Sequence, residues 1–142
     1  MRKSILFRTL ATVAIFAAGF WAGNKQGQAA AANRVFELRT YYTHDGKLPD
    51  LLARFRNHTT KLFEKHGMTN VGYWVPQDKP ASDGTLIYVL SYPNRDAAKK
   101  AWDGFRTDDE WKKARAASEV NGPIVKKVES VYMEPTDFSK MK

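Results

Sequence analysis

The sequence predicts an α+β fold of the ferredoxin-like type, with the element order βαββαβ and a four-stranded antiparallel sheet covered by helices on one face. Its length of 142 residues gives room for one domain. Apolar residues recur at helical spacing in two stretches, one before and one after a central pair of strand-like segments. Four segments are rich in β-branched and aromatic residues, as strands are: 35–42, 70–75, 85–92 and 125–133.

The first strand alternates between an apolar and a mixed set of side chains. Phe36 and Leu38 point to one face, and Glu37, Arg39 and Tyr41 point to the other. The strand therefore has one apolar face and one face that mixes charged and aromatic groups.

The first helix follows the turn at Asp45-Gly46. Pro49 suits a first helical turn, Leu51, Phe55 and Leu62 recur at helical spacing, and Gly67 stops the helix. A single helix is expected between Pro49 and Gly67.

The second half contains a hairpin and two further helices. Residues 76–84 are rich in Pro, Asp, Lys and Gly and form the loop of the hairpin. Asn94 caps the next helix, and Thr107 with Glu110 three residues later forms a capping box for another one. Gly122-Pro123 ends that helix before the last strand.

The helices leave the other face of the sheet bare. We expect that face to carry Val35, Tyr41 and either Tyr73 or Trp74, which is too apolar for water. A second copy of the chain is the natural cover, so the sequence predicts a homodimer.

Residues 1–32 resemble a secretory signal peptide, and residues 33–142 form the domain. A basic start with Arg2, Lys3 and Arg8 precedes a charge-free stretch from Thr9 to Gly23, and Ala29–Ala32 offers cleavage sites. We expect a periplasmic or secreted protein without stable membrane insertion after cleavage. The alternatives are an uncleaved membrane anchor, for which the apolar stretch is short, and an organelle transit peptide.

Charge and cysteine content restrict the function. The whole chain has a formal net charge of +8, but the leader contributes four positive charges, which leaves 8 − 4 = +4 for the domain. That value is ordinary for a globular domain, and with export it argues against nucleic acid as a partner. The chain has no cysteine, which excludes disulfides, thiolate chemistry and a lipoprotein anchor.

Four segments of the chain resemble the NIPSNAP family. They are the opening Val35–Tyr42, the segment Phe105–Arg115, Ser118-Glu119 with the following Gly122–Val125, and the close Met133–Ser139. The resemblance implies the dimeric α/β-barrel form of the ferredoxin-like fold, in which two sheets close over one another. It implies no settled activity, and the leader differs from the mitochondrial presequences of animal members.

The candidate pocket residues are Glu37, Arg39, Tyr41, His58 and Trp74. On one strand face, Arg39 could hold an anionic or carbonyl group and a partly desolvated Glu37 could act as a base. The competing interpretation is a structural ion pair within the chain or across the dimer.

Little else in the sequence carries chemistry. His58 lies at the edge of the apolar helix face, where it could reach a pocket and ligate haem iron or simply border the core. His66 precedes Gly67, where it interacts favourably with the helix C-terminus. No ligand spacing predicts a metal site, and we expect no cofactor.

Three functions remain open from the sequence. The first is a homodimer that binds a small molecule in a sheet-lined pocket. The second is a cofactor-free or haem-using oxidoreductase of the dimeric barrel class, and the third is a protein-interaction module. No catalytic motif decides whether the protein is an enzyme.

Overall fold

The computed structural model describes residues 34–142, so the predicted signal segment 1–32 lies outside the described part. Four strands pair antiparallel in the order β2-β3-β1-β4. Their bounds are β1 Val35–Thr43, β2 Thr69–Trp74, β3 Thr85–Tyr92 and β4 Val125–Met133. This order is that of the ferredoxin-like fold, which confirms the predicted fold class.

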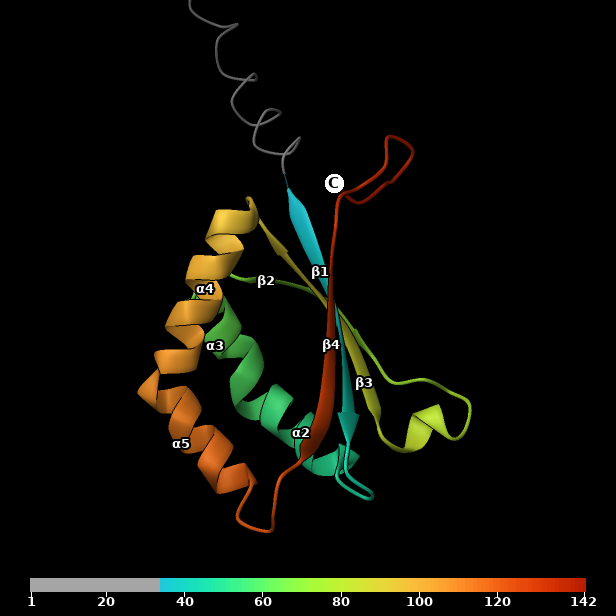
Figure 1. Cartoon of the computed structure of the whole chain (residues 1–142), viewed down its shortest axis with the longest axis vertical. Helices are drawn as coiled ribbons and strands as arrows, with labels where there is room; N and C mark the ends of the chain where they lie inside the picture. Colours follow the sequence, from blue (N-terminus) through green and yellow to red (C-terminus); the bar gives the residue numbers. More distant parts are fainter. Residues whose placement is uncertain (1–33) are drawn as a thin grey trace, which may run out of the picture.

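The α-helices all cover one face of the sheet, and the opposite face carries none of them (Figure 1). None of the helices within residues 34–142 is long and apolar enough to span a membrane. The helical elements are α2 Leu48–Arg54, η1 Phe55–Thr59, α3 Thr60–Lys65, η2 Ala81–Asp83, α4 Arg95–Thr107 and α5 Asp109–Ser118.

Several helix boundaries follow the predicted local signals. Pro49 lies in the first turn of α2, and Gly67 takes φ +82° just after α3, a conformation that favours glycine. Asn94 caps α4, because its Oδ1 accepts a hydrogen bond from the Ala97 amide at 2.8 Å.

The predicted capping box of α5 is wrong by one residue. The Asp108 carboxylate is the cap, since its Oδ1 accepts from the Glu110 and Trp111 amides at 2.7 and 3.3 Å. The Thr107 hydroxyl instead donates to backbone carbonyls of α4. An aspartate adds a negative charge at the helix N-terminus, where the helix dipole favours it.

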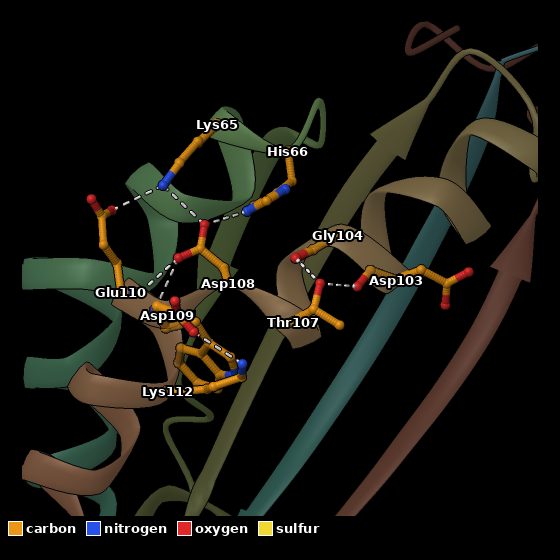
Figure 2. A network of polar contacts seen from close by, with 10 residues as sticks. Lys65, His66, Asp103, Gly104, Thr107, Asp108, Asp109, Glu110 and Lys112 are labelled. Atoms are coloured by element: carbon orange, nitrogen blue, oxygen red, sulfur yellow. Dashed lines mark hydrogen bonds and ion pairs between the residues drawn. The ribbon is translucent and has the colours of Figure 1, made fainter.

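Asp108 also ties α5 to the end of α3 (Figure 2). Its Oδ2 lies 2.9 Å from Lys65 Nζ and 2.7 Å from His66 Nε2. Hydrogen bonds from Lys65 and His66 lower the pKa of Asp108 below its usual value. One carboxylate thereby caps a helix and holds two helices together.

The sequence predicts one uniform helix between Pro49 and Gly67, but the structure shows a break in its regularity. Its middle, Phe55–Thr59, is a π-helical turn between α2 and α3. Two threonine hydroxyls bond backbone carbonyls in this turn. Thr59 Oγ1 donates to the Arg54 carbonyl, and Thr60 Oγ1 donates to the Phe55 carbonyl. Such turns insert one extra residue into a helix and are frequent at functional sites.

The core between sheet and helices is largely aromatic. The Phe63 ring packs against Trp102 and Phe105 of α4, and Phe55 packs edge-on against Tyr88 of β3. These contacts bury large apolar surfaces, and the edge-to-face geometry adds stabilisation.

The predicted assignment of the sheet faces is wrong. Val35, Tyr41 and Tyr73 lie on the face that the helices cover, where Tyr41 contacts Phe55 and Tyr73 stacks on Tyr88. The mixed face of β1 packs against the helices because its charged side chains find buried hydrogen-bond partners there. Apolar content alone therefore does not decide which face of the sheet the helices cover.

The opposite face, which we call the bare sheet face, carries a broad apolar patch beside the polar groups of Tyr42, Lys127 and Glu129. Trp74 is the one residue of the expected set that lies there; its ring lies over Gly72 and its side chain is 53% exposed. Val131 on the same face is 55% exposed. The apolar residues of this face are Phe36, Leu38, Val71, Trp74, Ile87, Val89, Val131 and Met133.

Candidate ligand-binding site

Glu37 is the centre of a buried polar network on the helix-covered face of the sheet. Its Oε2 accepts from the Tyr92 hydroxyl at 2.6 Å and from Trp102 Nε1 at 2.7 Å. Its Oε1 accepts from Arg39 and from the Ser130 hydroxyl, both at 2.6 Å. All four strong acceptor directions of the carboxylate are therefore used.

This environment keeps Glu37 ionised. Burial alone would raise the pKa of Glu37, but the hydrogen bonds from Ser130, Tyr92, Trp102 and Arg39 outweigh it and hold the pKa below its usual value. A carboxylate with a low pKa and no free acceptor direction is poorly suited to remove a proton from a substrate. The network favours a positioning role for Glu37 over the predicted role as a base.

Arg39 is held between this network and two aromatic rings. Its guanidinium lies 4.3 Å from the Trp102 ring and 5.5 Å from the Tyr41 ring, which are cation–π distances. One of its nitrogens bonds Glu37, whereas its Nε has no hydrogen-bond partner among the described residues.

Tyr88 lies directly opposite Arg39 in the pairing of β1 and β3 and is fully buried. Its ring packs 5.3 Å from the ring of Tyr41, yet its hydroxyl makes no hydrogen bond to any residue in the range 34–142. Burial and the nearby Tyr41 raise the pKa of Tyr88, so the phenol stays protonated near neutral pH.

A cavity of about 280 Å³ lies between the sheet and the helices, and we call it the inner cavity. Tyr41 and Val128 line it from the sheet, and Trp111 lines it from α5. Val128 is 41% exposed, which places the opening along the edge strand β4. The remaining lining residues are Arg54, Phe55, Thr59, Phe63, Phe105, Arg115, Glu119, Pro123 and Val125.

Arg54 brings a buried charge to the helical wall of this cavity. Its side chain is 3% exposed, and its Nη1 donates to Glu119 at 3.0 Å and to Ser118 at 3.2 Å. The guanidinium lies 5.3 Å from the Trp111 ring, and its Nε has no partner within the described chain. Burial of Glu119 acts against its ionisation, but Arg54 and Arg115 outweigh this and lower its pKa.

The structure brings three of the five predicted pocket residues together. Glu37, Arg39 and Tyr41 form one cluster beside the inner cavity. His58 is exposed on η1 and lines open grooves between that turn and α5. Trp74 lies on the bare sheet face, so neither His58 nor Trp74 reaches the cluster.

The inner cavity does not offer haem an iron ligand. No histidine within residues 34–142 lines it, and His58 points to a different surface. In the same part of the chain, no three metal-ligating side chains come together.

Sequence reasoning missed Arg54 and Tyr88. Arg54 directly precedes Phe55 and follows Leu51 by three residues, so it lies on the apolar stripe of its helix. A charged residue on such a stripe is a signal for a buried partner. Tyr88 carries no signal of its own, because an aromatic residue in a strand is typical of core packing.

A ferredoxin-like domain with an aromatic cavity between its sheet and helices is the class that these observations define. The NIPSNAP family model matches residues 36–140, and the chain belongs to the NIPSNAP family. No protein of curated function matches the sequence.

Solved structures show the same fold. A NIPSNAP family protein of unknown function from Agrobacterium tumefaciens is 18% identical with a TM-score of 0.67, over 78% of this chain and 96% of that one. A second NIPSNAP family protein from the same organism is 22% identical with a TM-score of 0.67, over 78% and 100% of the two chains. SnoaB, a cofactor-independent oxygenase from Streptomyces nogalater, is 12% identical with a TM-score of 0.53, over 77% and 99%.

Proposed function

We propose that this NIPSNAP protein is an exported homodimer that binds a small molecule in the inner cavity of each subunit. The observation that carries the proposal is the cavity itself. It penetrates from the edge strand β4 to the buried residues Thr59 and Phe63. Its volume of about 280 Å³ is just below the usual range of ligand pockets, which is about 300–1,000 Å³, and suits a small ligand.

The bare sheet face supports the homodimer. Eight apolar residues lie on one side of four strands, and two of them, Trp74 and Val131, are more than half exposed. Contiguous exposed apolar surface of this kind marks an interaction site. An identical sheet provides a self-complementary cover, because a twofold interface uses the same patch on both subunits.

The N-terminal segment supports export. A basic start, an apolar stretch and a run of alanines precede the domain, in the order of a secretory signal. The mature protein would then act in the periplasm or outside the cell.

Native mass spectrometry of protein purified after export tests all three parts at once. The expected spectrum shows a dimer of chains that have lost about 32 residues and that carry the added mass of a ligand. Monomer at micromolar concentration would contradict the dimer, and an intact leader would contradict cleavage.

Two matched variants assign the added mass to the cavity. Val128→Trp places a large ring at the opening and should abolish the added mass. Val120→Trp introduces the same ring at a position that is 76% exposed and outside the inner cavity, and it should retain the added mass. Retention in both variants would place the ligand elsewhere.

A cofactor-independent oxygenase is the second candidate function. The supporting observations are the fold shared with SnoaB and an aromatic cavity flanked by Arg39 and Tyr88. Oxygen consumption by the purified protein in the presence of its own released ligand tests this candidate. Turnover that disappears in Val128→Trp but not in Val120→Trp would favour the oxygenase over a binding protein.

A further inference from the structure

Three buried side-chain atoms flank the inner cavity without a hydrogen-bond partner in residues 34–142. They are Nε of Arg39, Nε of Arg54 and the hydroxyl of Tyr88. A guanidinium nitrogen can only donate, and a phenol that stays protonated can donate as well. Buried polar groups are nearly always paired in native proteins, so three unpaired donors indicate that an acceptor completes them.

Only one of the three donors belongs to a residue that lines the cavity, and the other two lie behind the lining. Arg54 lines it from α2, next to Phe55. Tyr88 lies behind two lining residues on the sheet side, since its ring is 5.3 Å from Tyr41 and 5.2 Å from Phe55. Arg39 also approaches Tyr41, with its Nη2 3.5 Å from the Tyr41 hydroxyl.

Positive charge exceeds negative charge around the cavity. Glu119 is shared by two arginines, because Arg54 Nη1 binds its Oε1 at 3.0 Å and Arg115 Nε binds its Oε2 at 3.1 Å. The Glu37 carboxylate is neutralised by Arg39 and faces four donors. One positive charge therefore remains uncompensated at a site where low polarity strengthens its attraction for an anion.

The aromatic side chains that line the inner cavity favour a ligand with a flat apolar ring. Phe55, Phe63 and Phe105 contribute rings from three helical elements, and Trp111 closes the row with its ring 4.5 Å from that of Phe105. Aromatic side chains favour other rings in stacked or edge-to-face contact. The volume admits only a compact ligand.

We infer that the ligand of this site is a compact aromatic anion, such as a carboxylate, whose ring packs against the aromatic wall and whose oxygens accept hydrogen bonds from Arg54. This inference rests on the proposed function, because it names the class of ligand for the same cavity. Arg54 is the residue that determines the specificity, since it is the one of the three donors that lines the cavity.

A set of three naphthalene derivatives tests the charge preference. Tryptophan fluorescence titration compares 2-naphthoate with the neutral 2-naphthamide and the cationic 2-naphthylmethylamine, which share the ring and differ in the polar group. The naphthoate should bind at least about tenfold more tightly than the amide, because charge-assisted hydrogen bonds are the stronger ones. The amine should bind more weakly than the amide.

One substitution and two controls assign the preference to Arg54. Arg54→Met keeps the length of the side chain and should weaken naphthoate binding by at least about tenfold while leaving the amide within about twofold. Tyr88→Phe removes a buried hydroxyl behind the cavity lining and should change neither affinity. Lys112→Met removes a cation from the exposed side of α5 and should also change neither affinity.

The outcomes separate this inference from the proposed function. Equal or tighter binding of the amide or the amine would overturn the anion preference and leave the cavity as a ligand site. Unchanged naphthoate affinity in Arg54→Met would also overturn it. Failure of all three compounds to bind the wild-type dimer would contradict both the inference and the binding function.

Discussion

Trp102 donates a hydrogen bond from its indole Nε1 to Oε2 of Glu37 across 65 residues of chain, at 2.7 Å. The bond joins α4 to the central strand β1 and is one of the hydrogen bonds that keep the buried carboxylate ionised. Through Arg39, which bonds Glu37 and lies over the Trp102 ring, the same carboxylate positions a cation beside the inner cavity. The stability of the domain and the geometry of the site therefore depend on one side chain.

Replacing Glu37 by Gln should destabilise the domain by roughly 3–5 kcal/mol, the usual cost of breaking a buried ion pair. In the variant, the amide NH₂ group, which can only donate, would face groups that donate to a carboxylate oxygen in the wild type. Urea unfolding measures the loss. Glu110→Gln is the matched control on the surface of α5, where the side chain is 69% exposed, and should change the stability by less than about 1 kcal/mol.

The stability should fall in acid, because the folded-state pKa values of Glu37 and Glu119 are both below 4.5, their ordinary value. A carboxyl group with a lowered pKa stabilises the fold above its unfolded pKa, about 4.3, and loses this contribution as the pH falls through the folded pKa. The urea midpoint should be flat above about pH 6 and should decline below about pH 4. Glu37→Gln should make the decline shallower, and an unchanged slope would contradict the assignment.

Two buried tyrosines on β3 should respond in opposite directions to loss of the hydroxyl. Tyr88→Phe removes an unpartnered group and should stabilise the ligand-free protein by about 1 kcal/mol. Tyr92→Phe removes a donor to Glu37 at 2.6 Å and should destabilise it by about 1–3 kcal/mol. Thermal unfolding of the two variants compares them directly, and a loss of stability in Tyr88→Phe would show that its hydroxyl is already paired.

A charge on the bare sheet face should dissociate the proposed dimer. Val131→Lys places an ammonium group on the apolar part of that face, where a buried charge would be unpaired. Light scattering should show monomer for this variant and dimer for Val120→Lys, whose valine is 76% exposed away from the sheet. A dimeric Val131→Lys would mean that the subunits associate through another surface.

Asp108 should show separable effects of capping and charge. Asp108→Asn keeps an acceptor for the Glu110 and Trp111 amides but loses the charge that binds Lys65. Asp108→Ala loses both. The melting temperature should fall in both variants and should fall further in Asp108→Ala, and equal values would assign the whole effect to the salt bridge.

The fold could be predicted from the sequence because its boundaries have local causes. Asn94 caps a helix by bonding an amide three residues away, and Gly67 is placed by its freedom to take positive φ. Strand β4 was predicted with the bounds that it has, since its alternation needs no knowledge of its partners. Such signals lie within a few residues of the feature that they produce.

The candidate site was predictable only in part, because it is assembled from distant segments. Glu37, Arg39 and Tyr41 share a strand, so their grouping follows from alternation alone. Arg54 is brought to the cavity by the packing of α2 on α5, through a bond to Glu119 that is 65 residues away in sequence. The mixed face of β1 packs toward the helices because Glu37 accepts hydrogen bonds from Tyr92, Trp102 and Ser130. These three residues belong to three other elements, so their contacts could not be read from the strand itself.

The π-helical turn Phe55–Thr59 makes the helix tolerant of a single-residue deletion at that turn. Removing one residue from this turn would restore regular α-helix and leave the two flanking helices nearly in phase, because the wider turn already accommodates the extra residue. Removing a residue from α3 instead would rotate everything on its N-terminal side by about 100° and carry Arg54 away from Trp111 and Glu119. In comparisons among homologues, a single-residue gap within positions 55–59 would therefore mark the loss of the wide turn in chains that still keep the arginine at the cavity.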